Sequence, residues 1–155
     1  MTFSLPNRAV RILALLFLTF WACRGSGREV LYHRFPYRVW RDGDTLWAEI
    51  EVKKAGAIYD IALEVGLTAE YPWRNLYLMT LWEHPDGFRQ ASRIEFVFQD
   101  EAGQWYTRDG RFHTFLGQGV SFGSIGRYRL GLLPYVRSDS VPGIRFLSVR
   151  LYSRQ

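Results

Sequence analysis

The chain has 155 residues, of which 48% are hydrophobic and 17% aromatic, and it carries a formal net charge of +5. Its basic residues are interleaved with acidic ones, which argues against the continuous basic surface of a nucleic-acid-binding protein, so no nucleic-acid partner is expected. Because Cys23 is the one cysteine in the sequence, an internal disulfide is excluded.

Residues 1–22 have the composition of a cleaved signal peptide. They contain Arg8 and Arg11, no acidic residue, and an apolar run of 11 residues from Ile12 to Ala22. A helix needs about 20 apolar residues to cross a bilayer, so this run indicates an export leader rather than a permanent span. Removing it leaves 133 residues with 18 basic and 15 acidic side chains, a net charge of +3.

Cys23 follows the leader directly and is preceded by the small residue Ala22, as in a bacterial lipobox, where a lipid-modified cysteine becomes the new N-terminus. Phe20 and Trp21 depart from the tighter form of that motif. The alternative is an ordinary secretory peptide that leaves Cys23 as a free thiol, but an unpaired exported cysteine needs an explanation. We therefore expect acylation of Cys23 and a membrane anchor, followed by a flexible Gly/Ser-containing tether that completes the segment 23–28.

Period-two alternation predicts one all-β domain over residues 29–155. In the strand expected over Thr45–Lys53, every second residue is apolar, and the segment ending near Leu67 repeats the pattern. The residues expected to face inward are Leu46, Ala48, Ile50 and Val52 in the first segment and Ile61, Leu63, Val65 and Leu67 in the second. Further strands are expected over Val30–Phe35, Leu76–Glu83, Ile94–Gln99, Gln104–Arg108, Arg127–Leu133 and Arg145–Tyr152.

Turn residues separate these segments, for example Asp42-Gly43-Asp44 and Pro85-Asp86-Gly87. Eight or so short strands joined in this way predict a single antiparallel β-sandwich with a jelly-roll-like arrangement. Most tryptophan and tyrosine side chains are then expected in its core. The glycine-rich stretch Leu116–Gly126 is interpreted as a long loop, and Gly119-Val120-Ser121-Phe122-Gly123 within it as a turn, because it lacks the strand-to-helix context of a nucleophilic serine.

Little in the sequence indicates metal or catalytic chemistry. His33, His84 and His113 are far apart and have no second His or Cys at ligand spacing, so neither a zinc site nor a cofactor is expected. Asp42 and Asp44 offer two carboxylates without a complete calcium loop. Acidic residues in turns ordinarily cap their own backbone, and the chain is therefore expected not to be an enzyme, although paired acids of a hydrolase would be invisible at this level.

The densest polar and aromatic cluster runs from Glu70 to Tyr77. Its ordinary role is a structured corner, because Pro72 stiffens the chain and an asparagine can bond to the neighbouring backbone. The alternative interpretation is that the cluster recognises a partner, because tryptophan, tyrosine and arginine dominate binding hot spots. The candidate partner-contact residues are Tyr71, Trp73, Arg74 and Asn75.

The order of several short motifs resembles the GldH family of gliding-motility lipoproteins. The motifs are Tyr71-Pro72-Trp73-Arg74-Asn75-Leu76-Tyr77-Leu78, Pro85-Asp86-Gly87, Arg93-Ile94-Glu95-Phe96, Asp100 with Gly103-Gln104-Trp105, Gly126-Arg127-Tyr128 and Gly143-Ile144. The resemblance implies a non-catalytic accessory of the gliding machinery and its associated protein-secretion system. It also implies attachment to the cell envelope through Cys23, at the outer membrane, with other envelope proteins as partners.

The alternative function is a lipid-anchored carbohydrate-binding β-sandwich module. In such a module exposed Trp73, Trp82 or Trp105 would stack on sugar rings. Because Trp82 is expected on the strand face of Leu76 and Leu78, it should be buried, which counts against this alternative. A third possibility, an anchored hydrolase, requires two acids that converge in a cleft.

Overall fold

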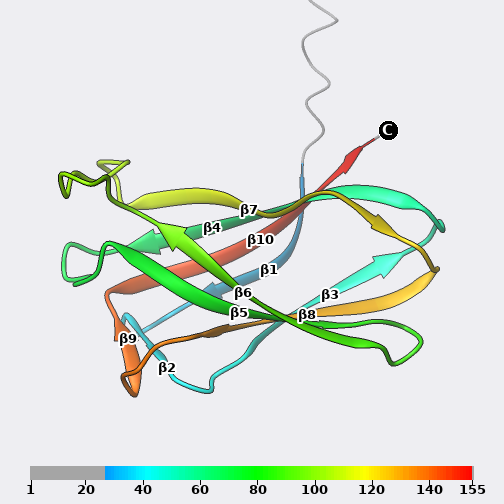
Figure 1. The fold of residues 1–155 in the computed structure, drawn as a ribbon, viewed down its shortest axis with the longest axis horizontal. Coiled ribbons are helices and arrows are strands. Elements are labelled where there is room, and N and C mark those ends of the chain that lie inside the picture. Colours follow the sequence, from blue (N-terminus) through cyan, green and yellow to red (C-terminus); the bar gives the residue numbers. More distant parts are fainter. Residues whose placement is uncertain (1–26, 155) are drawn as a thin grey trace, which may run out of the picture.

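The computed structural model of the protein describes residues 27–154, which form ten β-strands and no helix (Figure 1). The predicted leader, Cys23 and all of the predicted tether before Gly27 lie outside the described residues. The strands are β1 (Arg28–Arg34), β2 (Val39–Arg41), β3 (Leu46–Val52), β4 (Ala57–Leu67), β5 (Asn75–Glu83), β6 (Arg89–Val97), β7 (Arg111–Phe122), β8 (Gly126–Pro134), β9 (Ser140–Pro142) and β10 (Ile144–Arg154). Over residues 27–154 nothing qualifies as a membrane-spanning helix.

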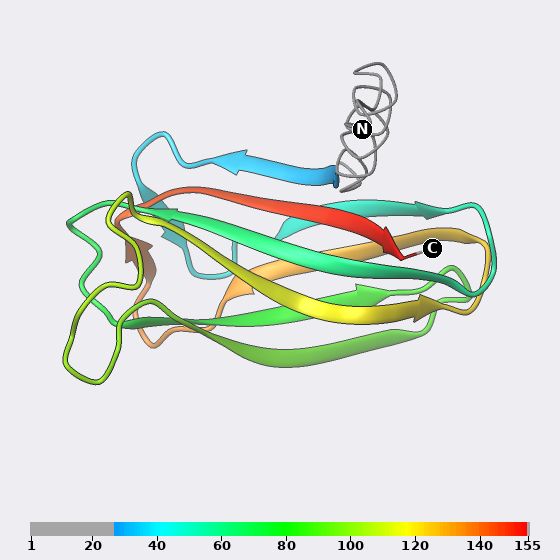
Figure 2. The same ribbon diagram turned by 90° about the horizontal axis from the view of Figure 1, so that it is seen from above.

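The eight longer strands form two antiparallel four-stranded sheets that face each other (Figure 2). Their orders are β1-β10-β4-β7 and β3-β8-β5-β6, while β2 and β9 form a separate short ribbon. If the eight long strands are numbered consecutively, the two sheets read 1-8-3-6 and 2-7-4-5, which is the jelly-roll order of two interlocked Greek keys. The predicted all-β, antiparallel, jelly-roll-like sandwich is confirmed.

The core lies between the sheets and is filled by the alternating aliphatic residues that the sequence predicts. The expectation that most tryptophan and tyrosine side chains lie in it is wrong, because among the described residues Trp40, Tyr71 and Tyr128 are the buried ones. Ala48, Ile50 and Val52 of β3 are buried, as are the inward residues of β4 and β10. Each fully buried aliphatic side chain contributes about 1.5–3 kcal/mol through the area that it removes from water. Trp82 shares the inward face of β5 as predicted, and its ring centroid lies 6.1 Å from that of Phe122 in the opposite sheet.

The prediction of a long loop over Leu116–Gly126 is wrong, because most of this stretch belongs to β7. β7 pairs with β4 as far as Phe122, and the register between the two strands shifts near Tyr59 and Ile61. The glycines do not end the strand, because bulges accommodate extra residues there and Gly119 adopts a φ of +62°. The predicted turn over Gly119–Gly123 is therefore largely the end of a strand, and the actual connection to β8 is residues 123–125.

The predicted strand over Gln104–Arg108 is also wrong. This segment lies in the β6–β7 loop, where a single bridge joins Trp105 to Gln99. A tight turn precedes it, with the Gly103 N–H bonded to the Asp100 carbonyl, and a second turn follows at Asp109 and Gly110. Too few residues remain between these turns to form a ladder. Sequence patterning also did not indicate β2 and β9, which have three residues each.

The strand directions give the domain two different ends (Figures 1 and 2). β1 begins beside the end of β10, with Arg28 paired to Leu151, and the short connections β3–β4, β5–β6 and β7–β8 lie at this same end. We call it the proximal end. The opposite end, here the distal end, carries the β2–β9 ribbon, the β8–β9 connection and the two longest connections, β4–β5 and β6–β7.

Candidate functional site

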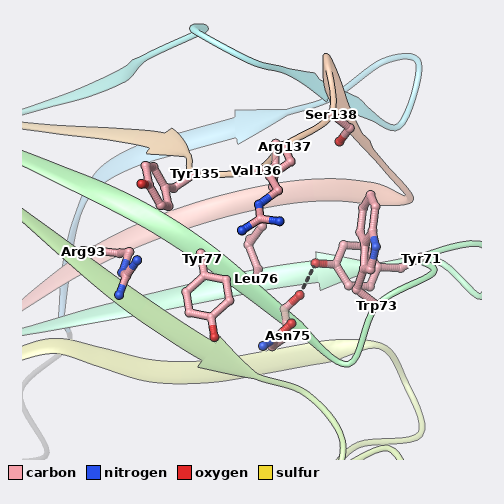
Figure 3. Close-up of a pocket in the computed structure, with 10 residues that line it drawn as sticks. All are labelled: Tyr71, Trp73, Asn75, Leu76, Tyr77, Arg93, Tyr135, Val136, Arg137 and Ser138. Carbon is pink, nitrogen blue, oxygen red and sulfur yellow. Dashed lines mark hydrogen bonds between the residues drawn. The ribbon is translucent and has the colours of Figure 1, made fainter.

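A groove of about 810 Å³ opens at the distal end, on the outer side of the β5–β6–β8 sheet (Figure 3). Three of the four predicted contact residues line it, namely Tyr71, Trp73 and Asn75. The remaining lining residues are Leu76, Tyr77, Arg93, Tyr135, Val136, Arg137 and Ser138. The groove therefore combines one loop before β5 with outward positions of β5 and β6 and with the segment after β8.

Tyr71 fixes the base of the loop that enters β5. Its ring is buried and packs edge-on against Phe98 at 5.4 Å, and its hydroxyl donates a hydrogen bond to the Asn75 carbonyl at 2.7 Å. Burial raises the pKa of the Tyr71 hydroxyl well above its usual range, so this group stays protonated and donates at every physiological pH. Tyr71 is thus a structural residue of the site rather than an exposed contact.

Trp73 is the exposed member of the predicted cluster. Its ring packs edge-on against Tyr71 at 5.6 Å, and 38% of the residue remains accessible. Pro72 between the two restricts the backbone, so the exposed indole is held in place at a low entropic cost. An aromatic ring that is supported from below and open above is the arrangement found at binding hot spots.

Arg74 and Asn75 hold the corner together. The Arg74 guanidinium donates to the Asp100 carbonyl at 3.0 Å, and the Phe98 N–H donates to the Arg74 carbonyl at 2.8 Å, so Arg74 ties the β4–β5 loop to the β6–β7 loop. The Asn75 amide donates to the Glu95 carboxylate of β6. The cluster is thus both a structured corner and one wall of a groove, and Arg74 belongs to the corner alone.

The opposite wall was not predicted from the sequence. The Arg93 guanidinium lies 5.7 Å from the centre of the Tyr77 ring and 5.6 Å from that of Tyr135, a double cation–π contact. Figure 3 shows these three side chains on one side of the groove, with Tyr71 and Trp73 on the other and Arg137 between them. The sequence indicates only that Tyr77 and Arg93 occupy outward positions of their strands. Their proximity to each other and to Tyr135 depends on strand pairing, in which Met79 pairs with both Arg93 and Leu133.

The chemistry of the groove suits recognition. It offers rigid aromatic surface and two guanidinium groups, those of Arg93 and Arg137. Within residues 27–154, no group of three or more His, Cys, Asp or Glu side chains could hold a metal ion. Trp73 and Trp105, both partly exposed, line different cavities rather than one row, and Trp82 packs inward against the core.

The fold and the groove define a class of protein: a jelly-roll domain with an aromatic and basic groove at one end. Residues 30–151 match the family model described as GldH lipoprotein, and the chain belongs to this family. It is therefore a gliding-motility-associated lipoprotein of the membrane-anchored, cell-envelope class, and its family is not a known enzyme family.

No curated protein sequence matches the chain. Among solved structures, it is similar to the serine protease of Aeromonas sobria, with 13% sequence identity and a TM-score of 0.29. The similarity covers 91% of this chain but 29% of the protease. A TM-score of this size supports no statement about shared fold or activity.

Proposed function

We propose that this protein is a non-catalytic accessory component of the gliding-motility machinery and its associated protein-secretion system. It is attached to the outer membrane by acylated Cys23. Residues 1–22 form the cleaved leader, residues 23–28 the lipidated tether, and residues 29–155 the β-sandwich. The family membership supports this assignment, together with the basic, apolar leader that ends at the sole cysteine.

The partner contact of this accessory is the distal groove. The observation that carries the proposal is that two features lie at opposite ends of the domain. The chain enters β1 at the proximal end, while the groove lies at the distal end. An anchor before Arg28 therefore holds the proximal end toward the membrane and leaves the groove free for another envelope protein. The groove contains the exposed aromatic side chains of Trp73, Tyr77 and Tyr135, and aromatic residues of this kind contribute most to protein interfaces.

The anchor is tested by comparing the full chain with its Cys23→Ala variant. The wild type should lose residues 1–22, gain the mass of a lipid and partition into the membrane fraction, whereas Cys23→Ala should be released into the soluble fraction. Intact mass spectrometry and fractionation measure both. An unmodified wild-type chain in the soluble fraction would contradict the anchor and shift the assignment to a secreted binding module.

The partner contact is tested by affinity capture from membranes of the native host. Truncation of a hot-spot side chain costs about 2 kcal/mol, or roughly a 30-fold loss of affinity. Trp73→Ala and Arg137→Ala should therefore remove the same envelope proteins from the captured set. Tyr37→Ala is the matched control, because Tyr37 is a fully exposed aromatic residue at the same end but outside the groove. Equal capture of these envelope proteins by the wild type, the two groove variants and the control variant would contradict the proposed contact.

A further inference from the structure

A second cavity at the distal end, of about 730 Å³, has a different composition from the groove and shares no lining residue with it. Three arginines line this cavity, Arg38, Arg108 and Arg145, against a single acidic residue, Asp109. We call it the arginine cavity. Trp105 and Phe112 supply aromatic surface, and Thr68 and Gln104 supply uncharged polar groups.

Arg38 is held in an unfavourable backbone conformation. Its φ is +56°, and within residues 27–154 every other residue with a positive φ is a glycine. A side chain with a Cβ is disfavoured in this left-handed region, where glycine has no such cost. The surrounding chain enforces the conformation, because the Arg38 carbonyl accepts hydrogen bonds from the N–H groups of Gly143 at 2.7 Å and Ile144 at 3.2 Å.

The Arg38 side chain does not compensate for this cost through contacts within the protein. Its nearest ionic partner is Glu70 at 3.9 Å, and both side chains are more than half exposed. Surface pairs of this kind contribute little to stability. An arginine that strains the backbone without a strong internal partner is explained if its guanidinium binds something outside the chain.

Arg145 is already oriented for such a role. Its Nη2 atom donates to the carbonyl oxygens of Asp109 at 3.0 Å and Gly110 at 3.4 Å, which fixes the plane of the guanidinium. Its Nε atom is buried and has no hydrogen-bond partner within residues 27–154. Asp109 is occupied by the backbone: the Arg111 N–H donates to its carboxylate at 3.0 Å and holds the pKa of that carboxyl below its usual range. Asp109 therefore stays ionised and offsets one of the three arginine charges, so the lining keeps a net positive charge.

We propose that the arginine cavity binds an acidic sugar of an anionic glycan. A planar carboxylate matches the guanidinium fork, and two or three arginines recognise it better than lysines would. The partly exposed Trp105 ring offers a flat apolar surface for the sugar ring, and Thr68 and Gln104 offer hydrogen-bonding partners for hydroxyl groups. This site is independent of the proposed protein contact in the groove.

The test uses the full-length protein in neutral detergent, with oligogalacturonate as the probe, neutral galactose oligomers and inorganic phosphate as the comparison ligands, and calorimetry as the readout. Oligogalacturonate should bind, and the neutral oligomer should bind at least 10-fold more weakly. Equal binding of the neutral oligomer, or binding of phosphate as tight as that of the uronate, would overturn the assignment to an acidic sugar.

Two substitutions at Arg38 separate binding from folding. Arg38→Gly and Arg38→Ala should each weaken oligogalacturonate binding at least 10-fold. The melting temperature of Arg38→Gly should equal or exceed that of the wild type, because glycine removes the backbone strain, whereas Arg38→Ala retains the strain and should melt below Arg38→Gly. Wild-type affinity in Arg38→Gly, or a melting temperature below that of the wild type, would overturn the proposal.

Discussion

At the scale of single residues, Gly143 joins the elements of the distal end. Its N–H donates to the Arg38 carbonyl at 2.7 Å, and its own carbonyl accepts from the Thr68 N–H at 2.8 Å. A Cβ on Gly143 would stand 2.6 Å from the backbone N and Cα of Tyr71, a distance that real side chains do not tolerate. This glycine therefore positions the loop that carries Trp73.

We expect Gly143→Ala to lower the free energy of unfolding by more than about 2 kcal/mol, because a backbone clash adds to the cost of a positive φ. Gly43→Ala is the matched control: Gly43 also has a positive φ, of +82°, but nothing lies within 4 Å of its Cβ position. It should cost only about 1–2 kcal/mol. Urea unfolding measures both, and equal losses would contradict the packing role of Gly143.

At the scale of elements, Asp60 of β4 stabilises the bulged end of β7. Its carboxylate accepts from the Gly119 N–H at 2.7 Å and pairs with the Arg154 Nε of β10 at 2.8 Å, so one side chain joins three strands. The Arg154 side chain, followed by the Gly119 N–H, holds the pKa of the Asp60 carboxyl below its usual range. The lowered pKa means that folding favours the charged carboxylate.

Because the folded-state pKa is depressed, this stabilisation is fully present above pH 4 and is lost as the pH falls through the folded pKa. Asp60→Asn can keep a bond from Gly119 through its amide oxygen but does not titrate. The wild type should therefore be more stable than Asp60→Asn at pH 6, and the difference should shrink steadily toward pH 2.5. Urea midpoints across this pH range measure the difference, and one that does not depend on pH would contradict the role of Asp60.

The same strands show what sequence patterning can and cannot predict. β3 and β4 follow their expected alternation because each has one face in the core. β7 forms where the sequence predicts a loop, because the glycines at its bulges have the composition of a loop. The Tyr71 and Trp73 wall was predictable because it is contiguous in sequence, whereas the Tyr77, Arg93 and Tyr135 wall is assembled by long-range pairing of β5 with β6 and β8.

At the scale of the whole molecule, the jelly roll separates the end where the chain enters from the end that carries the groove and the arginine cavity. The β3–β4, β5–β6 and β7–β8 connections lie at the proximal end with Arg28 and Arg154, and both the groove and the arginine cavity lie at the distal end. An anchored domain built this way presents two chemically different surfaces away from the membrane. The family membership and the predicted export leader fit this geometry.

Site-specific photo-crosslinking in the native host tests this end-on arrangement most directly. A photoreactive residue at position 138, where the exposed Ser138 lines the groove, samples the groove and leaves Trp73 in place. One at position 125 samples the proximal end, where Ile125 is 63% exposed. Position 138 should give discrete adducts with envelope proteins, and position 125 should give none of these. The same adducts from position 125, or adducts from that position alone, would contradict the end-on arrangement.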